Sequence, residues 1–128
     1  MIIGFVNVYR DAIVRLQIDG LQGQTQQIET VVDTGFTGAL TLPLSVIQSL
    51  GLPFRRSGRT SLSDGSESLF DIYEATVDWD GQPRRVSVDS AETDPLLGMS
   101  LLEGYELRVQ VRTGGGVFIT PLPVSSTP

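Results

Sequence analysis

The sequence predicts a single all-β domain, and three observations support this fold class. Segments in which apolar and polar residues alternate recur along the chain, about nine in all, as in β-barrels and sandwiches. Turn-forming pairs such as Asp19-Gly20 and Asp80-Gly81 separate these segments. One segment alone has convincing helical character, so alternating βαβ units are not indicated. No repeat or linker divides the 128 residues.

The first strands are expected in the N-terminal quarter of the chain. Residues 1–9 are rich in β-branched and aromatic residues, which predicts an edge strand. Residues 12–18 alternate, with apolar side chains at the even positions, and are typical of a half-buried strand. Residues 26–32 are expected to be its partner.

Residues 43–50 predict the one helix. Pro43 suits a first helical turn, and apolar residues recur at three-residue spacing from Leu44 to Leu50. Gly51 then suits a left-handed C-terminal cap.

A long hairpin is expected next, with arms at residues 59–63 and 67–79 on either side of the turn Ser63-Asp64-Gly65-Ser66. Its second arm alternates, which places five apolar residues on one face: Leu69, Tyr73, Ala75, Val77 and Trp79.

The C-terminal third predicts three further strands, at residues 85–89, 105–111 and 117–119, with a helical turn at residues 99–103. The domain is expected to span residues 1–121. The Pro- and Ser-rich tail, residues 122–128, is expected to be frayed.

Composition excludes much enzyme chemistry. The chain has no His and no Cys, and all 9 of its basic residues are Arg. Catalysis by a Ser-His-Asp or Cys-His pair, a Schiff-base lysine, and zinc or haem held by His or Cys are therefore excluded. Carboxylates, hydroxyls and guanidinium groups remain. Because no calcium-loop pattern accompanies the carboxylates, we expect neither a metal site nor a cofactor.

Charge and hydropathy limit the expected partners and location. The net charge of -6 offers no basic surface for nucleic acid. The apolar runs are too short to span a membrane, and the first residues lack the features of a signal peptide. We therefore expect a cytoplasmic protein that binds neither nucleic acid nor membrane.

The candidate catalytic residue is Asp33, in the segment of residues 30–38. It ends an apolar strand and is followed by Thr34 and Gly35. A carboxylate entering apolar surroundings loses solvation, so it must be hydrogen-bonded or protonated, which suggests a functional role. Asp, Thr and Gly are also common turn residues, so a simple turn is the alternative interpretation.

The context of Asp33-Thr34-Gly35 resembles that of the retroviral-type (retropepsin-like) aspartic proteases, and most closely their small bacterial members. Residues 40–43 follow the acid motif, an intervening hairpin comes next, and Leu96-Leu97-Gly98 then precedes a short helix. The resemblance spans residues 12–121, and its most specific part is the order of these elements. It implies a closed β-barrel of the acid-protease type. It also implies an enzyme that hydrolyses peptide bonds.

The resemblance assigns a role to each matching residue. Asp33 matches the catalytic aspartate, Thr34 the residue whose hydroxyl locks two active-site loops across a dimer interface, and Gly35 a site of close substrate approach. Leu97 and Gly98 match the apolar turn beneath that loop.

The expected substrate-binding residues come from two segments. The tip of the hairpin matches the flap that closes over an extended peptide. The expected set is Gly35, Phe36, Thr37, Ser63, Asp64 and Gly65. Phe36 departs from the family pattern, since it replaces a small residue and narrows the cleft.

Aspartic proteolysis needs two carboxyl groups that share one proton. No second motif is convincing, because Asp89-Ser90-Ala91, the nearest, lacks the glycine. The expected enzyme is therefore a homodimer to which each subunit contributes Asp33. One alternative is a weak or inactive dimer that binds peptides or proteins. The other is a β-barrel interaction module in which the motif is only a turn.

Overall fold

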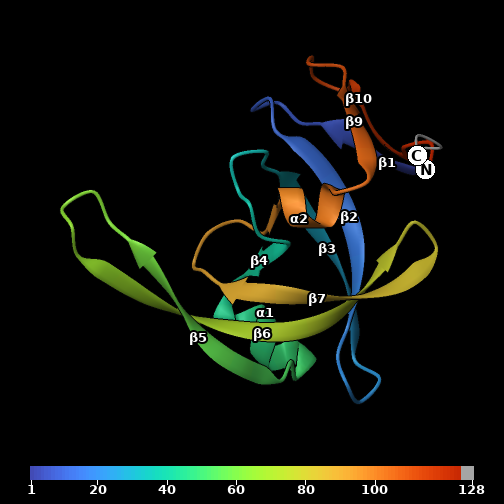
Figure 1. Cartoon of the computed structure of the whole chain (residues 1–128). Helices are drawn as coiled ribbons and strands as arrows, with labels where there is room; N and C mark the ends of the chain where they lie inside the picture. The colour runs from blue at the N-terminus through green and yellow to red at the C-terminus, as the bar shows by residue number, and fades with distance from the viewer. Residues whose placement is uncertain (125–128) are drawn as a thin grey trace.

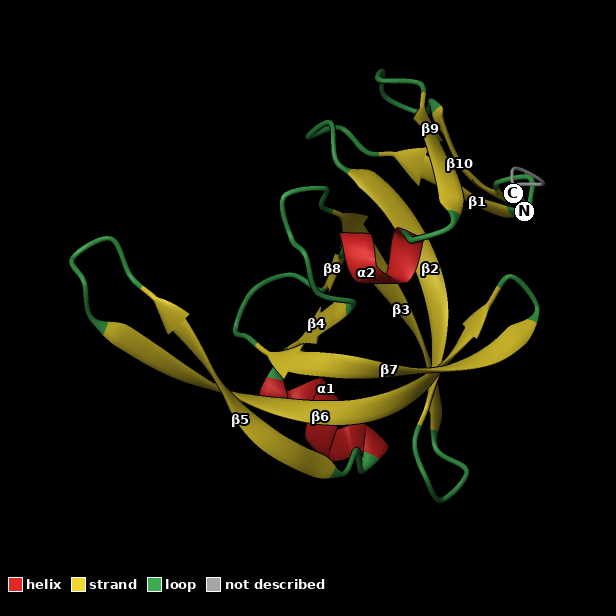
Figure 2. Cartoon of the chain, viewed as in Figure 1, coloured by secondary structure: helices red, strands yellow, loops and turns green. Residues whose placement is uncertain are grey.

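The computed structural model of the chain describes residues 1–124. Strands form most of this part (Figure 2), as the sequence predicts. Its strands are β1 (Ile2–Val6), β2 (Ala12–Asp19), β3 (Thr25–Val32), β4 (Leu40–Leu42), β5 (Phe54–Ser61), β6 (Glu67–Trp79), β7 (Gln82–Ser90), β8 (Leu96–Leu97), β9 (Tyr105–Val109) and β10 (Gly116–Pro121). Its helices are α1 (Leu44–Leu50) and α2 (Met99–Leu102). Neither helix is long enough to cross a membrane.

The strands form one sheet that partly closes on itself. Their order is β5-β6-β7-β4-β8-β3-β2-β1-β10-β9, and β6 also pairs with β2. This extra pairing joins Ile18 to Val77 and closes a ring of strands: β2, β3, β8, β4, β7 and β6. The remaining strands, β1, β10 and β9, continue the sheet beyond β2, and β5 forms its opposite edge (Figure 1).

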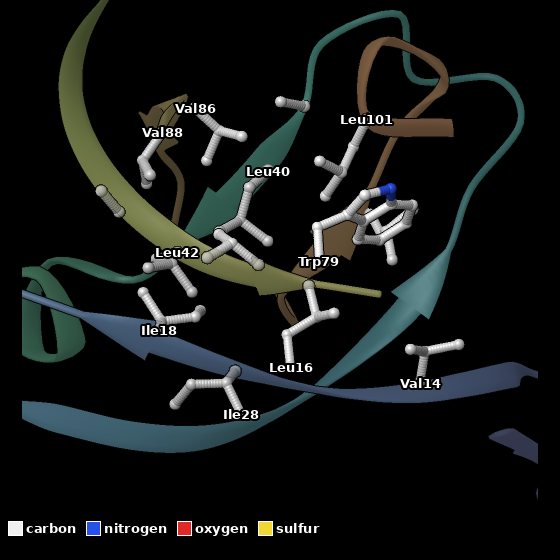
Figure 3. Packing of buried hydrophobic residues seen from close by; sticks show 14 of the residues in the cluster. Val14, Leu16, Ile18, Ile28, Leu40, Leu42, Trp79, Val86, Val88 and Leu101 are labelled. Carbon is white, nitrogen blue, oxygen red and sulfur yellow. The ribbon is translucent and has the colours of Figure 1, made fainter. Parts of the chain in front are cut away.

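Most apolar side chains of the ring point inward and form one buried cluster. Val14, Leu16 and Ile18 of β2 are buried and Ala12 is half-buried against them, which confirms the predicted face. Figure 3 shows side chains of β2, β4 and β7 that belong to this cluster: Val14, Leu16, Ile18, Leu40, Leu42, Val86 and Val88.

Trp79 closes one side of this cluster, next to Leu101 in Figure 3. It is 4% exposed and meets the edge of the Tyr105 ring at a centroid distance of 5.5 Å. The sequence predicts a core or interface role for Trp79, and the structure places it in the core. Its Nε1 bonds to no acceptor in the described part of the chain.

The predicted helix is present as α1, with Pro43 as its N-terminal flanking residue and Ile47 and Leu50 buried. Gly51 has φ 62° and its N–H donates to Gln48 O at 3.0 Å, so it caps the helix in the left-handed conformation.

Strand β1 is shorter than predicted, and the prediction of an edge strand is wrong, because β1 pairs with both β2 and β10. It ends at Val6, not at residue 9, because the Asn7 side chain draws the chain into a turn. Its Oδ1 accepts the N–H groups of Tyr9 at 3.0 Å and Asp11 at 2.9 Å, which removes these donors from the sheet.

The predicted hairpin forms as β5 and β6 and extends away from the rest of the chain (Figure 1). Its first arm begins at Phe54, earlier than predicted. Leu69 lies on the same face of β6 as Tyr73 but is 66% exposed, because the distal part of the hairpin is beyond the reach of the core. Ile72, on the opposite face, is buried.

The C-terminal part contains one element of a different kind from that predicted. Leu96 and Leu97, expected in a turn, form the short strand β8. The strand predicted at residues 105–111 ends at Val109. Of the tail predicted at residues 122–128, residues 125–128 lie outside the described part of the chain.

We predict that Leu40→Ala destabilises the fold far more than Leu44→Ala. Leu40 is fully buried and pairs with both Val88 and Leu97, so truncation leaves a cavity where β4 joins its neighbours. The expected loss is about 3 kcal/mol, against less than about 1 kcal/mol for Leu44, which is 39% exposed. Urea unfolding at one protein concentration measures both, and equal losses would contradict this view of the core.

Candidate active site

Asp33 lies immediately after β3, where this strand runs parallel to β8. Val31 and Val32 pair with Leu96 and Leu97, and the Asp33 N–H donates to Leu97 O at 2.9 Å. The half-buried Asp33 is therefore fixed through its main chain to the end of β8.

The Asp33 carboxylate organises a tight turn. Its Oδ1 accepts the Gly35 N–H at 2.9 Å, and the Asp33 carbonyl accepts the Phe36 N–H at 3.1 Å. Thr34 and Gly35 are exposed at the apex. Within residues 1–124, the Thr34 hydroxyl forms no hydrogen bond, and the carboxylate accepts only this one.

The segment after Asp33 is bound to the start of α2 by main-chain hydrogen bonds. The N–H groups of Met99 and Ser100 donate to Phe36 O at 2.8 Å and Gly38 O at 3.1 Å. The Gly98 N–H donates to Ala39 O at 3.0 Å. The predicted supporting turn therefore contacts the Asp33 loop directly.

Gly98 permits this contact. A Cβ at this position would lie 2.2 Å from Gly38 O and 2.5 Å from the Phe36 ring. A Cβ at Gly38 would also lie 2.5 Å from that ring. The Phe36 ring therefore rests on two glycines and remains half-buried, which explains how the loop accepts a large residue here.

A groove of about 370 Å³ lies beside this loop. Phe36 and Thr37, two of the predicted substrate-binding residues, form part of its wall. The other walls come from β4, from both arms of the β5–β6 hairpin, and from the end of β7 with the residue after it: Thr41, Arg59, Thr60, Phe70, Asp89, Ser90 and Ala91.

The remaining predicted binding residues do not line this groove. Gly35 lies in the exposed turn at Asp33, and Ser63, Asp64 and Gly65 lie at the exposed hairpin tip. The single chain thus brings the hairpin arms to the groove and leaves the tip extended (Figure 1).

The hairpin tip is held by its own hydrogen bonds. Asp64 Oδ1 accepts the Ser66 hydroxyl at 2.6 Å and the Ser66 N–H at 2.9 Å. These bonds favour the charged form and lower the pKa of Asp64. Gly65, at φ 86°, completes the turn.

Asp89 is the acid that the sequence analysis considered only as a second catalytic residue. It is half-buried on the groove wall, and a Cβ at Gly38 would lie 3.5 Å from its Oδ2. Burial raises the pKa of Asp89, and the Arg56 charge opposes this shift more weakly. The β7 alternation could have revealed its position, because Val86 and Val88 face the core and Asp89 therefore faces away from it.

Of the comparisons with known proteins, the one with solved structures supports the fold. No protein-family model matches the chain, and no curated protein matches it. Among solved structures, the chain is similar to a retropepsin-like aspartic protease from Rickettsia conorii, with 19% sequence identity and a TM-score of 0.53. The match covers 95% of this chain and 92% of that chain.

The chain has the retropepsin-like fold. The motif pattern around Asp33-Thr34-Gly35 predicts this fold, and the structural match extends over nearly the whole chain. In the retropepsin-like fold, as seen in this chain, the Asp-Thr-Gly turn and the β8–α2 segment form one hydrogen-bonded unit.

We predict that Gly98→Ala is more damaging than Gly23→Ala. The new methyl group at position 98 meets main-chain atoms, whereas a Cβ at Gly23 has open space around it. We expect a loss of about 3 kcal/mol at Gly98 and about 1 kcal/mol at Gly23, where φ is +85°. Urea unfolding curves measure both losses, and a Gly98 variant as stable as the Gly23 variant would disprove the close contact.

We also predict that Asp89→Asn stabilises the protein at neutral pH. Because the pKa of Asp89 is raised in the folded state, the protonated acid is compatible with the fold at low pH. The free energy of unfolding then falls as the pH rises through the folded-state pKa, since the acid becomes charged. Asparagine stays neutral and avoids this loss. Because Asp89 is partly solvated, the expected gain at pH 7 is only about 0.5 kcal/mol. The gain should vanish below pH 3.8, the ordinary pKa of an aspartate side chain. Unfolding curves measured across this range would refute the prediction if the variant were less stable at pH 7.

Proposed function

We propose that the chain is an aspartic endopeptidase that acts as a homodimer, with a water molecule activated between two Asp33 carboxyls. One observation carries the proposal. A single Asp-Thr-Gly turn follows β3 and is hydrogen-bonded to the β8–α2 segment, in a chain with the retropepsin-like fold. The fold alone hosts more than one function, so the proposal depends on the chemistry of this turn.

The proposed chemistry follows from the charge of two adjacent carboxyls. Two bare negative charges about 3 Å apart are too costly, so the pair holds one proton. The ionised carboxyl takes a proton from water as the water oxygen attacks the peptide carbonyl carbon. The protonated carboxyl hydrogen-bonds and protonates the carbonyl oxygen. The C–N bond of the tetrahedral intermediate then breaks as the first carboxyl gives its proton to the departing nitrogen and the second recovers a proton from a hydroxyl of the intermediate.

The need for a second carboxyl supports a symmetric dimer. The chain contains one Asp-Thr-Gly sequence, so a two-fold axis through the paired loops would supply the second acid. The exposed Thr34 hydroxyl, which lacks a partner in the described residues, suits a contact across that axis. The exposed Gly35 leaves room for a substrate main chain.

The β5–β6 hairpin suits the role of a substrate cover. It extends beyond the sheet, and its outer strand β5 forms the sheet edge. An extended peptide can add hydrogen bonds to such a hairpin while its side chains enter the neighbouring groove. Closure of the tip residues Ser63, Asp64 and Gly65 would exclude water from the reacting peptide bond.

We predict that Asp33→Asn reduces kcat for peptide cleavage by about a thousandfold or more, because the pair loses its base. Asp78→Asn is the matched control, since Asp78 is an exposed acid of β6 outside the groove. Its activity should equal that of the wild type. Cleavage should persist in EDTA and decline towards alkaline pH. Undiminished cleavage by Asp33→Asn would refute the proposal, and peptide binding without cleavage would favour the inactive binding module.

We also predict that the Asp33→Asn subunit suppresses wild-type activity when the two are mixed and allowed to exchange subunits. A mixed dimer has one carboxyl, so activity should fall roughly as the square of the wild-type fraction. The Asp78→Asn subunit should not suppress it. Activity that merely follows the amount of wild-type chain would contradict a shared site, as would a chain that stays monomeric in sedimentation with peptide present.

A further inference from the structure

The Asp89 carboxylate faces the groove without a hydrogen-bond donor. It forms no ion pair or hydrogen bond in the described part of the chain, although it is half-buried. A partly buried carboxylate is stabilised by donors or a positive charge, and neither of its neighbours in the sheet, Ile72 and Thr41, is hydrogen-bonded to it in the described residues. The Thr41 hydroxyl oxygen accepts the Leu96 N–H at 2.8 Å.

The arginines near the groove have other roles. Arg59 forms an ion pair with Glu67 at 3.7 Å. Arg84 donates to two carbonyl oxygens of α2, at 3.0 and 3.2 Å. Arg56, exposed on β5, attracts Asp89 but does not outweigh the effect of burial on its pKa. The carboxylate therefore retains capacity for a further cation.

The groove has the form that a long basic side chain needs. Phe36 and Phe70 offer apolar walls for an aliphatic stem. Asp89 and the Ser90 hydroxyl provide acceptors for a cationic head, and Thr37 of the Asp33 loop lines the same groove.

A second pocket, of about 390 Å³, shares Thr37 and Asp89 with the groove. It is less suited to a basic side chain, because three arginines line it: Arg56, Arg84 and Arg85. Their charges would repel a cation that approached Asp89 from this side. The groove beneath the hairpin arms is therefore the side from which a basic group would reach Asp89.

We propose that Asp89 is a specificity-determining residue that binds a lysine or arginine side chain of the peptide substrate in the groove between Phe36 and Phe70. This assignment rests on the proposed peptidase function. Asp89 does not take part in bond cleavage. It binds a side chain at a fixed distance from the scissile bond, and the ion pair supplies the donor that the carboxylate lacks.

The experiment compares matched peptides. Cleavage of a peptide library prepared from a digested cell extract should show lysine or arginine enriched at one position relative to the cut. Two synthetic substrates are then made, with lysine or the uncharged isostere norleucine at that position. We expect wild-type kcat/KM to favour lysine about tenfold. Asp89→Asn should abolish this preference and cleave the norleucine peptide as the wild type does.

Asp78→Asn serves again as the matched control and should keep the lysine preference. A wild type without a basic preference would overturn the assignment, and so would an Asp89→Asn variant that retains it. The wild-type comparison needs no variant, so it remains decisive even if Asp89→Asn fails to fold.

The two proposals fail in different ways. Cleavage that depends on Asp33 but is equally fast for the lysine and norleucine peptides refutes the role of Asp89 and leaves the peptidase proposal standing. If no peptide is cleaved, the peptidase proposal fails, and fluorescence anisotropy decides the side-chain assignment with two labelled extended peptides that differ only by one lysine or norleucine residue. About tenfold tighter binding of the lysine peptide, lost in Asp89→Asn, would support it, and equal or undetectable binding would overturn it.

Discussion

The main-chain hydrogen bonds between the Asp33 loop and the β8–α2 segment are the constraint on which the site depends. They follow directly on the parallel pairing of β3 with β8. The strand pairs Val31–Leu96 and Val32–Leu97 are succeeded by the hydrogen bonds that hold the loop. This approach requires a residue without a side chain at Gly98. The main chain that carries one carboxylate is thus positioned by backbone hydrogen bonds between two segments that are distant in the chain, and the bond from the Gly35 N–H to Asp33 Oδ1 then orients the carboxylate.

The sequence predicts the parts of the fold that depend on local pattern. The alternation in β2, the cap at Gly51 and the turn at Ser63-Asp64-Gly65-Ser66 each require only neighbouring residues, and all are present. The strands β4 and β8 were not predicted, because strands of two or three residues carry no periodicity. Leu40 becomes a strand residue only through its pairs with Val88 and Leu97, which are distant in sequence.

In the candidate site, too, the features set by neighbouring residues are predictable and those assembled from distant segments are not. The Asp33-Thr34-Gly35 turn is recognisable because the motif is contiguous, whereas the groove is assembled from the Asp33 loop, the hairpin arms and the end of β7. The resemblance implies substrate contact at the hairpin tip, yet in the single chain the arms line the groove. Asp89 was considered only for its likeness to the acid motif. The structure shows that Asp89 lies on the groove wall beside Gly38.

Trp79 gives the molecule a spectroscopic reporter within its core. It is the only tryptophan, its ring is shielded from solvent, and it lies at the end of β6 opposite the hairpin tip. Its indole emission should therefore be blue-shifted in the native state and insensitive to movement of the tip. The same fluorophore becomes solvated when the ring of strands opens, so its emission separates global unfolding from local motion of the cover.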